Sequence, residues 1–216
     1  MEILNEIYKA LQMGNAKLVE TKTREAIDSK IVPEEILNKA LIASMEELGI
    51  NFKNGKVFLP EVMMAARAMQ AAMNILKPKL IETGVKPVGK AAIGTVKGDQ
   101  HDIGKNLVAM MMMGAGIEVI DLGTDVAPEK FVNAVYEHEV QIIALSALLT
   151  TTMPQQAQVI EELKKAGLRE KVKVIIGGAP VSENFAKEIG ADAYTPDAGS
   201  AALKAKELIL ELIRKD

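Results

Sequence analysis

The sequence of 216 residues predicts an α/β protein built in two parts, a four-helix bundle followed by five alternating strands and helices. Helical periodicity runs to about residue 82 and then stops. Beyond residues 83–87 (TGVKP), short and almost wholly apolar strands alternate with amphipathic segments. Such alternation is typical of a parallel sheet with helices on both faces. We therefore expect a helical domain at residues 1–84 and an α/β domain at residues 88–216.

The bundle is predicted from periodic segments that are separated by residues typical of helix ends. Its four helices are expected at residues 2–13, 15–29, 33–53 and 60–82. The breaks between them carry Gly, Asn or Pro: Gly14-Asn15, Val32-Pro33, Asn54-Gly55 and Pro60.

The fourth helix has an apolar stripe that predicts how it packs. Its members recur at steps of four and three residues, which puts them on one helix face: Val62, Ala66, Met69, Met73 and Leu76. Small residues stand beside the stripe, at Ala65, Ala68 and Ala72. Small side chains allow another helix to approach closely, so we expect a compact antiparallel bundle.

The second part is predicted to be a Rossmann-like (flavodoxin-like) domain with a five-stranded parallel sheet. Its strands are expected at residues 89–96, 117–121, 140–146, 172–176 and 192–195. Its helices are expected at residues 102–114, 128–138, 153–166, 182–189 and 197–215. The common strand order for five such units is 2-1-3-4-5, and ligands bind beyond the carboxyl ends of the strands where that order reverses. The loops after strands 1, 3 and 4 are therefore the expected functional loops.

Composition excludes several classes of function. The net charge is only -3, basic and acidic residues are mixed, and aromatic residues make up 3%, so we expect no nucleic-acid partner. Without cysteine, disulfides, thiolate metal sites and a Cys nucleophile are excluded. The N-terminal segment is acidic and amphipathic, and no long apolar run occurs, which favours a cytoplasmic protein without a membrane partner.

The loop after the first strand contains the most informative histidine. His101 is one of two histidines and lies between an apolar strand and a helix, where its imidazole is well placed to be a ligand. Asp99 stands two residues earlier and could accept the second ring N–H. The alternatives are a local hydrogen bond or helix cap for His101 and an Asx turn for Asp99. Asp102 is predicted to be the N-cap of the next helix.

The loops after strands 3 and 4 carry hydroxyls and glycines. Four hydroxyl residues fall between Ser146 and Thr152, where they could bond a buried polar ligand or form an ordinary strand end with a capping Thr. Gly177 and Gly178 permit close approach of a ligand, although a Gly pair also occurs in many turns.

The sequence fits neither of two common nucleotide-binding motifs. The spacing from Gly98 to Gly104 is one residue too long for a P-loop, and Asn106 replaces the hydroxyl residue that would hold magnesium. No GxGxxG follows the first strand, which disfavours a dinucleotide. His138 is expected to be exposed on a surface helix, and Met110–Met113 to fill the core.

Taken together, the patterns Asp99-x-His101-x-x-Gly104, Ser146-x-Leu148 and Gly177-Gly178 resemble the three-part signature of cobalamin-binding domains. Such domains occur in methionine synthase and in the corrinoid proteins of methyltransferase systems. The resemblance extends to the helical part, which ends in NGKVFLPEV like the helical cap of those proteins, and so covers nearly the whole chain.

The resemblance implies a cofactor and a role for each matching residue. The cofactor is cobalamin or a related corrinoid, and His101 is the lower ligand to cobalt. Asp99 bonds His101 and Thr152 supplies the third group of a relay, at a position where methionine synthase has Ser. The nucleotide tail is contacted by Ser146, Leu148 and Thr150, while Gly177 and Gly178 make room for it. The remaining expected contacts are Gly98, Gln100, Asp102, Ile103 and Gly104, and Phe58 of the cap is expected to shield the methyl group.

The resemblance also implies a shuttle that is not catalytic alone. A substrate-specific methyltransferase would load a methyl group onto cobalt, and a second one would deliver it to tetrahydrofolate or a thiol coenzyme. A reductive activator is a further implied partner. Three alternatives are a cobalamin subunit of a carbon-skeleton mutase, a cobalamin-dependent sensor, and a flavodoxin-like or receiver-like domain without corrinoid. The helical cap argues against the first, and the lack of a visible DNA-binding module against the second.

Overall fold

A computed structural model describes residues 2–214 of the chain. The chain forms two compact units: the first contains the chain up to Lys86 and the short segment Gly114–Gly116, and the second contains the rest from Pro87 onward. The expected end of the last helix at residue 215 lies outside the described residues.

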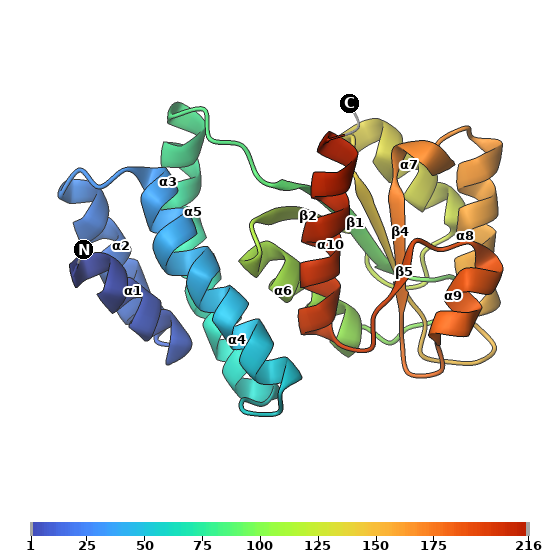
Figure 1. Cartoon of the computed structure of the whole chain (residues 1–216), viewed down its shortest axis with the longest axis horizontal. Coiled ribbons are helices and arrows are strands. Elements are labelled where there is room, and N and C mark those ends of the chain that lie inside the picture. The colour runs from blue at the N-terminus through green and yellow to red at the C-terminus, as the bar shows by residue number, and fades with distance from the viewer. Residues whose placement is uncertain (1, 215–216) are drawn as a thin grey trace. The chain divides into compact units, whose positions relative to one another are not determined.

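The first unit consists of helices, as predicted (Figure 1). They are α1 Glu2–Gln12, α2 Ala16–Asp28, α3 Pro33–Glu35, η1 Ile36–Ile42, α4 Ala43–Lys53 and α5 Leu59–Glu82. The segments α3, η1 and α4 together form the third predicted helix. Its middle, η1, is a π-helix, a wider coil that the sequence analysis did not predict. The apolar side chains of η1 are buried in the unit.

Local side-chain bonds explain where these helices begin. The side chain of Asn15 accepts a hydrogen bond from the Leu18 amide at 3.1 Å and so caps α2. Pro33 opens α3, where its missing N–H has no helical partner to lose. At the start of α5 the Glu61 carboxylate reaches back to the Phe58 amide at 2.7 Å, which satisfies an otherwise free donor.

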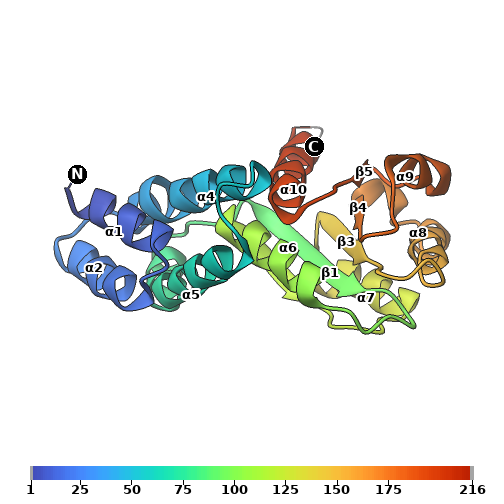
Figure 2. The ribbon, with the colours of Figure 1, turned by 90° about the horizontal axis from the view of Figure 1, so that it is seen from below.

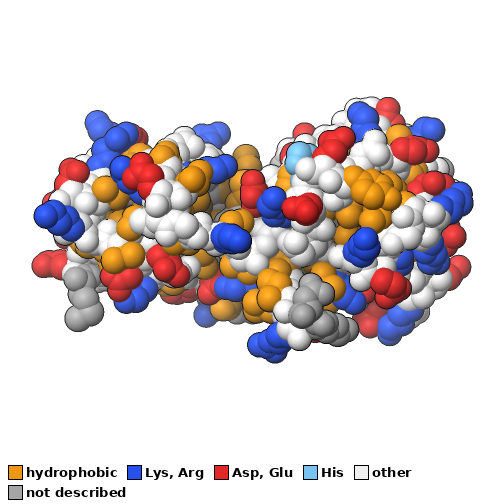
Figure 3. All heavy atoms as spheres, turned by 90° about the horizontal axis from the view of Figure 1, so that it is seen from above, with side chains coloured by type: hydrophobic (Ala, Val, Ile, Leu, Met, Phe, Trp, Pro, Cys, Tyr) orange, Lys and Arg blue, Asp and Glu red, His pale blue; other side chains and the backbone are white. Residues whose placement is uncertain are grey.

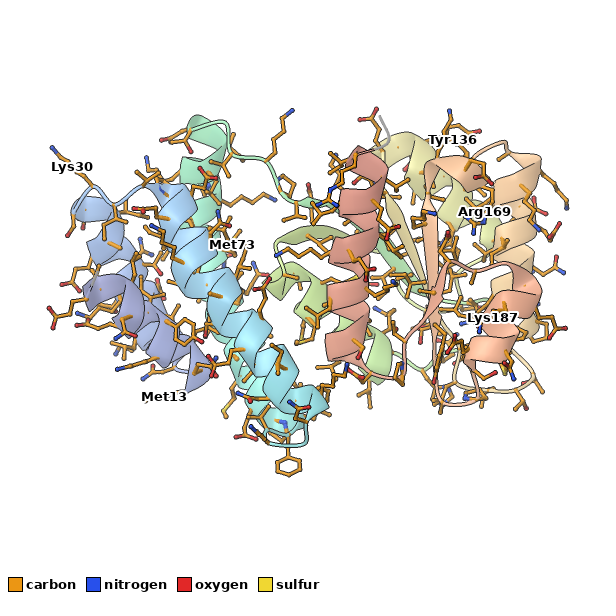
Figure 4. All side chains as sticks on the ribbon, in the orientation of Figure 1. Met13, Lys30, Met73, Tyr136, Arg169 and Lys187 are labelled. Atoms are coloured by element: carbon orange, nitrogen blue, oxygen red, sulfur yellow. The ribbon has the colours of Figure 1, made fainter. Side chains whose placement is uncertain are left out.

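The buried face of α5 differs in part from the predicted stripe. Its fully or nearly fully buried residues are Val62, Ala65, Ala68, Met69, Ala72, Leu76 and Leu80. Ala66 and Met73, predicted as stripe members, are only half-buried, and Met73 is labelled in Figure 4. The three alanines form the centre of the face rather than its margin. Small residues occupy the centre because α2 packs closely along α5.

Gly14 shows how close this packing is. Its φ of +65° is a conformation that glycine adopts without steric cost. A Cβ atom added there would lie 2.4 Å from the Met64 Cβ of α5. The turn between α1 and α2 is therefore held against α5 in a way that only glycine permits.

The second unit is the predicted five-stranded domain. Its strands are β1 Gly89–Thr95, β2 Ile117–Asp121, β3 Ile142–Ser146, β4 Lys173–Gly177 and β5 Ala193–Tyr194. Its helices are α6 Ile103–Gly114, α7 Pro128–His138, α8 Pro154–Lys165, η2 Arg169–Lys171, α9 Glu183–Ile189 and α10 Ala198–Ile213. The strands pair in parallel in the order β2-β1-β3-β4-β5, which confirms the predicted topology.

Helices cover both faces of this sheet. Figures 1 and 2 show α7, α8 and α9 on one face and α6 and α10 on the other. Phe131 of α7 is fully buried, and its ring lies so close to β1 that a Cβ at Gly94 would come within 2.8 Å of it. On this face, alternate apolar residues of β1, β3 and β4 form one continuous cluster with α7, α8 and α9.

The surface agrees with the mixed charge of the sequence. Figure 3 shows acidic and basic side chains interspersed over the face that it displays. Figure 4 labels Tyr136 and Arg169, which bond the Ala166 and Gly190 carbonyls, respectively. Among residues 2–214, no helix is both long and apolar enough to cross a membrane.

Candidate cofactor site

The three predicted loops begin at neighbouring positions of the sheet. Thr95 of β1 is paired in register with Ser146 of β3, and Ser146 is paired with Gly177 of β4. Figure 1 shows the loops that follow these strands at the same edge of the unit. The parallel sheet therefore brings together three segments that are far apart in the chain.

Asp99 is the centre of a hydrogen-bond network at this edge. Its side chain is fully buried. Oδ1 accepts from the His101 amide at 3.1 Å and lies 2.7 Å from Nδ1 of its ring. Oδ2 accepts from the amides of Leu148 at 2.8 Å and Leu149 at 3.3 Å, and from the Thr152 hydroxyl at 2.7 Å. One carboxylate thus ties the loop after β1 to the loop after β3.

These bonds determine the charge of Asp99. Burial alone would raise its pKa, because a buried carboxylate loses its hydration. The hydrogen bonds from the Thr152 hydroxyl, from the side chain and amide of His101 and from the Leu148 amide outweigh that effect. They hold the pKa of Asp99 well below its usual range, so the group is an anion at neutral pH.

The Asp99 anion fixes the orientation of His101. Because a carboxylate only accepts, the Nδ1 position carries the ring proton in this pair. That tautomer leaves the lone pair on Nε2. The His101 side chain is 51% exposed, so its ring can reach a group outside the loop. The Asx turn considered as an alternative is also present, through the His101 amide, and coexists with the ring contact.

Thr152 is the one hydroxyl of its run that bonds Asp99 among the described residues. Its oxygen also lies 2.9 Å from the Leu149 carbonyl, so the single hydroxyl proton has two acceptors in reach. The capping alternative for Thr152 is wrong, because α8 begins with Met153 at its N-cap position. Ser146 is half-buried at the end of β3, and Thr150 is exposed.

Gly178 lies in a crowded position. Its φ is +128°, which L side chains rarely adopt, and a Cβ there would come within 1.8 Å of the Ala147 carbonyl oxygen. At Gly177 the added Cβ would meet the Thr195 carbonyl oxygen at 3.4 Å, an ordinary contact. The close contact is thus between Gly178 and the backbone that follows β3.

The other residues of the loop after β1 form an open rim. Gly98, with a φ of +82°, donates its amide to the Asp125 carboxylate, and Gln100 accepts from Thr124. Ile103 is 72% exposed, and no atom lies within 4 Å of a Cβ added at Gly104. In the loop after β3, Leu148 is 41% exposed. Exposed apolar side chains beside a free imidazole suit a large, partly apolar ligand.

Asp102, His138 and the Met tract match their predictions to different degrees. Asp102 directly precedes α6, but its carboxylate accepts from the Asn106 side chain rather than from a helix amide. His138 is exposed, as predicted. Met111 and Met112 are buried, Met110 is half-buried and Met113 is 37% exposed, so the tract fills the core only in part.

Sequence reasoning missed four polar residues beside the network. Thr95 donates its hydroxyl to the His101 carbonyl at 2.8 Å, and Asp125 accepts from Gly98 at 2.7 Å. Lys105 is almost fully buried and pairs with Asp121 at 2.6 Å. The buried Gln156 amide donates to the carbonyls of Leu145 and Gly177.

Phe58 belongs to the helical unit. It lies at the N-cap position of α5 and its side chain is 68% exposed. Phe58 therefore does not fill the interior of the helical unit.

The donor set fits one kind of cofactor. Both Asp99 oxygens already accept hydrogen bonds, so the loop can offer a metal one ligand, the Nε2 atom of His101. One imidazole suits a metal ion that arrives within its own macrocycle. The fold and this site define a protein of the cobalamin-binding class.

Comparisons with known proteins agree with this class. Two models described as "B12 binding domain" match residues 3–77 and 89–205, and the chain belongs to the B12-binding family. Dimethylamine corrinoid protein 2 of Methanosarcina acetivorans is 50% identical over 97% of each chain. The trimethylamine corrinoid protein of Methanosarcina barkeri is 42% identical over 95% of each.

A solved structure extends the likeness to the whole fold. It is the methanol:cobalamin methyltransferase complex MtaBC from Methanosarcina barkeri. The match covers 99% of this chain and 84% of that chain, with 29% identity and a TM-score of 0.86.

Proposed function

We propose that this protein carries a methyl group on the cobalt of a bound corrinoid, with Nε2 of His101 as the lower ligand. The carrying observation is the pair of His101 and the buried Asp99 anion, joined at 2.7 Å. When bound, the corrinoid supplies a cobalt ion that accepts a methyl group and releases it. The chain contributes a ligand whose tautomer and direction are already set.

Within this proposal Asp99 and Thr152 complete the relay. Asp99 Oδ1 holds the Nδ1 proton of His101, which keeps the Nε2 lone pair free to bind a metal. The Thr152 hydroxyl donates to Oδ2 and helps to keep Asp99 ionised. Loss of either contact would leave the imidazole freer to rotate away.

The nucleotide tail of the corrinoid is proposed to enter beyond β3 and β4. Ser146 ends β3, Leu148 and Thr150 expose their side chains next to it, Gly177 ends β4, and Gly178 follows directly. The rim around His101 would contact the corrin ring through Gly98, Gln100, Asp102, Ile103 and Gly104. Residues 1–84 form the proposed cap and residues 88–216 the proposed cobalamin domain.

Phe58 is the proposed shield of the methyl group. Exposure of 68% of an aromatic side chain leaves a large apolar surface in water. Contact with a bound corrinoid would remove part of that surface from water, which favours the proposal.

The methyl donor is proposed to be a methylamine, with dimethylamine first. This rests on the relatives named for dimethylamine and trimethylamine, which align over nearly the whole chain. The proposed partners are a methyltransferase that binds the amine and a second one that passes the methyl group to tetrahydrofolate or a thiol coenzyme. A reductive activator would restore oxidised cobalt. The donor is held by the partner, so donor choice depends on which methyltransferase docks.

The ligand assignment can be tested by isotope labelling. The full chain is prepared with 15N-histidine and loaded with cob(II)alamin, and its electron paramagnetic resonance spectrum is compared with that of unlabelled protein. If His101 binds cobalt, the nitrogen splitting changes from triplet to doublet. His101→Ala should lose this signal, while His138→Ala should keep it. An unchanged triplet in labelled protein would mean that the cofactor keeps its own base.

The donor is tested with purified methyltransferases. The reduced, corrinoid-loaded protein is mixed with the enzymes for monomethylamine, dimethylamine, trimethylamine and methanol, each with its substrate. We expect the methylated spectrum to appear fastest with dimethylamine and its enzyme. Fastest methylation from methanol would exclude the amine assignment while leaving the carrier function intact.

A further inference from the structure

The backbone carbonyl of His101 has an unusual partner. The first helical hydrogen bond after the loop runs from the Asn106 amide to the Asp102 carbonyl at 2.7 Å. The His101 carbonyl lies one residue before that ladder and instead accepts the hydroxyl of Thr95 at 2.8 Å. The residue that presents the imidazole is thus tied directly to the last position of β1.

Thr95 is itself held firmly. Its side chain is fully buried. Its amide donates to the Gly123 carbonyl, and its carbonyl accepts from the Val126 amide, both at 3.0 Å. These bonds come from the loop after β2, on the side of β1 away from β3. The hydroxyl therefore projects from a fixed point of the sheet.

The same loop also holds the start of the histidine segment. The carboxylate of Asp125 accepts from the Gly98 amide at 2.7 Å, and the Asp125 amide donates to the Asp99 carbonyl at 2.9 Å. The segment from Gly98 to His101 is thus restrained from two directions. Asp99 binds it to the loop after β3, and Thr95 and the loop after β2 bind it from the other side.

We propose that Thr95 is a positioning residue for His101. The Thr95 hydroxyl determines what fraction of the bound cobalt has the His101 imidazole as a ligand. This inference rests on the proposed function. A segment that is ordered beforehand loses less entropy when its side chain ligates, so restraint of the His101 backbone favours the bound state. Without the hydroxyl, Asp99 still orients the ring, but the backbone that carries the ring moves more freely.

The test replaces the hydroxyl without emptying the interior. Thr95→Val keeps the branched shape and removes the donor, and Thr95→Ser keeps the donor and removes a methyl group. Thr21→Val is the matched control, because the Thr21 hydroxyl also donates to a carbonyl, that of Lys17 at 2.9 Å in α2. Each full-length variant is labelled with 15N-histidine and loaded with cob(II)alamin. The histidine-bound fraction is read from the nitrogen splitting.

Loss of one hydrogen bond predicts that the ratio of histidine-bound to histidine-free cobalt falls about fivefold in Thr95→Val. Thr95→Ser and Thr21→Val should keep the wild-type ratio. In the corrinoid-free protein the His101 amide should exchange its hydrogen about fivefold faster in Thr95→Val, and the midpoint of urea unfolding should fall because the His101 carbonyl loses its donor. A purely structural role would lower the midpoint in the same way but leave the ratio of histidine-bound to histidine-free cobalt unchanged.

The outcomes separate this inference from the function on which it rests. If wild type shows the doublet and Thr95→Val shows the same bound ratio, Thr95 has no positioning role and the carrier function stands. If labelled wild type shows no doublet, the ligand assignment itself fails. If the ratio of histidine-bound to histidine-free cobalt falls as far in Thr95→Ser as in Thr95→Val, the methyl group and not the hydroxyl is responsible, and the inference is overturned.

Discussion

The two units of this protein hold their residues in place by different kinds of interaction. The helical unit fixes its shape with apolar and small side chains, as the buried alanines of α5 and the contact at Gly14 show. The α/β unit fixes a single loop with polar bonds, centred on Asp99. Apolar packing tolerates a range of side chains of similar volume, whereas a buried carboxylate requires every donor to be in place. Substitutions in the two units should therefore fail in different ways.

The largest loss is expected at Gly178. Gly178→Ala should lower the free energy of unfolding by about 4 kcal/mol, because its Cβ would collide with the Ala147 carbonyl oxygen. Gly190→Ala is the matched control, since Gly190 also has a positive φ but open space around it, and should cost about 1 kcal/mol. Urea unfolding followed by circular dichroism measures both. Equal losses would mean that backbone conformation, and not the collision, matters at Gly178.

Asp99→Asn is expected to cost about 3 kcal/mol at neutral pH, because the new amide group would face donors where the carboxylate accepted. The pH dependence of this cost follows from the lowered pKa of Asp99. The unfolded chain binds this proton near pH 3.9, as ordinary Asp does, and the folded protein only at lower pH. The stabilisation is thus complete above about pH 5 and is lost as pH falls through and below about 4.

Unfolding of the corrinoid-free protein at several pH values tests this. Wild type should lose stability faster than Asp99→Asn between about pH 5 and pH 2, so the two curves converge in acid. Parallel curves would show that Asp99 titrates alike in folded and unfolded chains. Asp28→Asn, on an exposed residue of α2, serves as the control and should run parallel to wild type.

In the helical unit, Gly14→Ala is expected to cost about 2 kcal/mol, from its positive φ and its contact with Met64. The added Cβ would meet the Met64 Cβ at 2.4 Å and the Met64 backbone at 3.2 Å, so relief requires the turn to shift away from α5. The histidine-bound spectrum of the loaded protein should stay as in wild type. A changed spectrum would contradict the separation of the two kinds of positioning.

Phe58→Ala should change stability least, by about 0.5 kcal/mol or less, because the ring is largely exposed. If Phe58 shields the methyl group, the methylated protein should nevertheless lose its methyl group about threefold faster in light or water, as followed by absorbance. Ile50→Ala, on another exposed apolar residue of the helical unit, is the comparison and should have a wild-type lifetime. Equal lifetimes of the methylated protein in the two variants would show that Phe58 does not shield the methyl group.

Sequence alone predicted the fold because its signals are local or follow general rules. Apolar runs with Gly and Pro between them located the strands and helices, and five alternating units have one common strand order. The π-helical segment η1 was missed. Five of its seven residues are buried and apolar. So dense an apolar run fits a π-helical period as well as an α-helical one, so the sequence pattern could not distinguish them.

Spacing along the chain predicted only part of the candidate site. Asp99 and His101 are two residues apart, so their contact could be expected, whereas the bond from Thr152 to Asp99 was expected only from the family resemblance. Thr95 looked like an ordinary residue of an apolar strand, and Asp125 like an ordinary turn residue. Which atoms their side chains reach depends on how the loops after β1 and β2 fold, and spacing along the chain does not reveal that.

The hydrogen bonds to Asp99 also affect which metals the loop can take up. A carboxylate beside an imidazole is a common way to trap zinc from solution, but here both oxygens are engaged by amides, a hydroxyl and the ring itself. A hydrated zinc ion would have to break those bonds to gain a second ligand. The loop should therefore not bind divalent ions from solution, and His101 should remain available to the cobalt of a corrinoid.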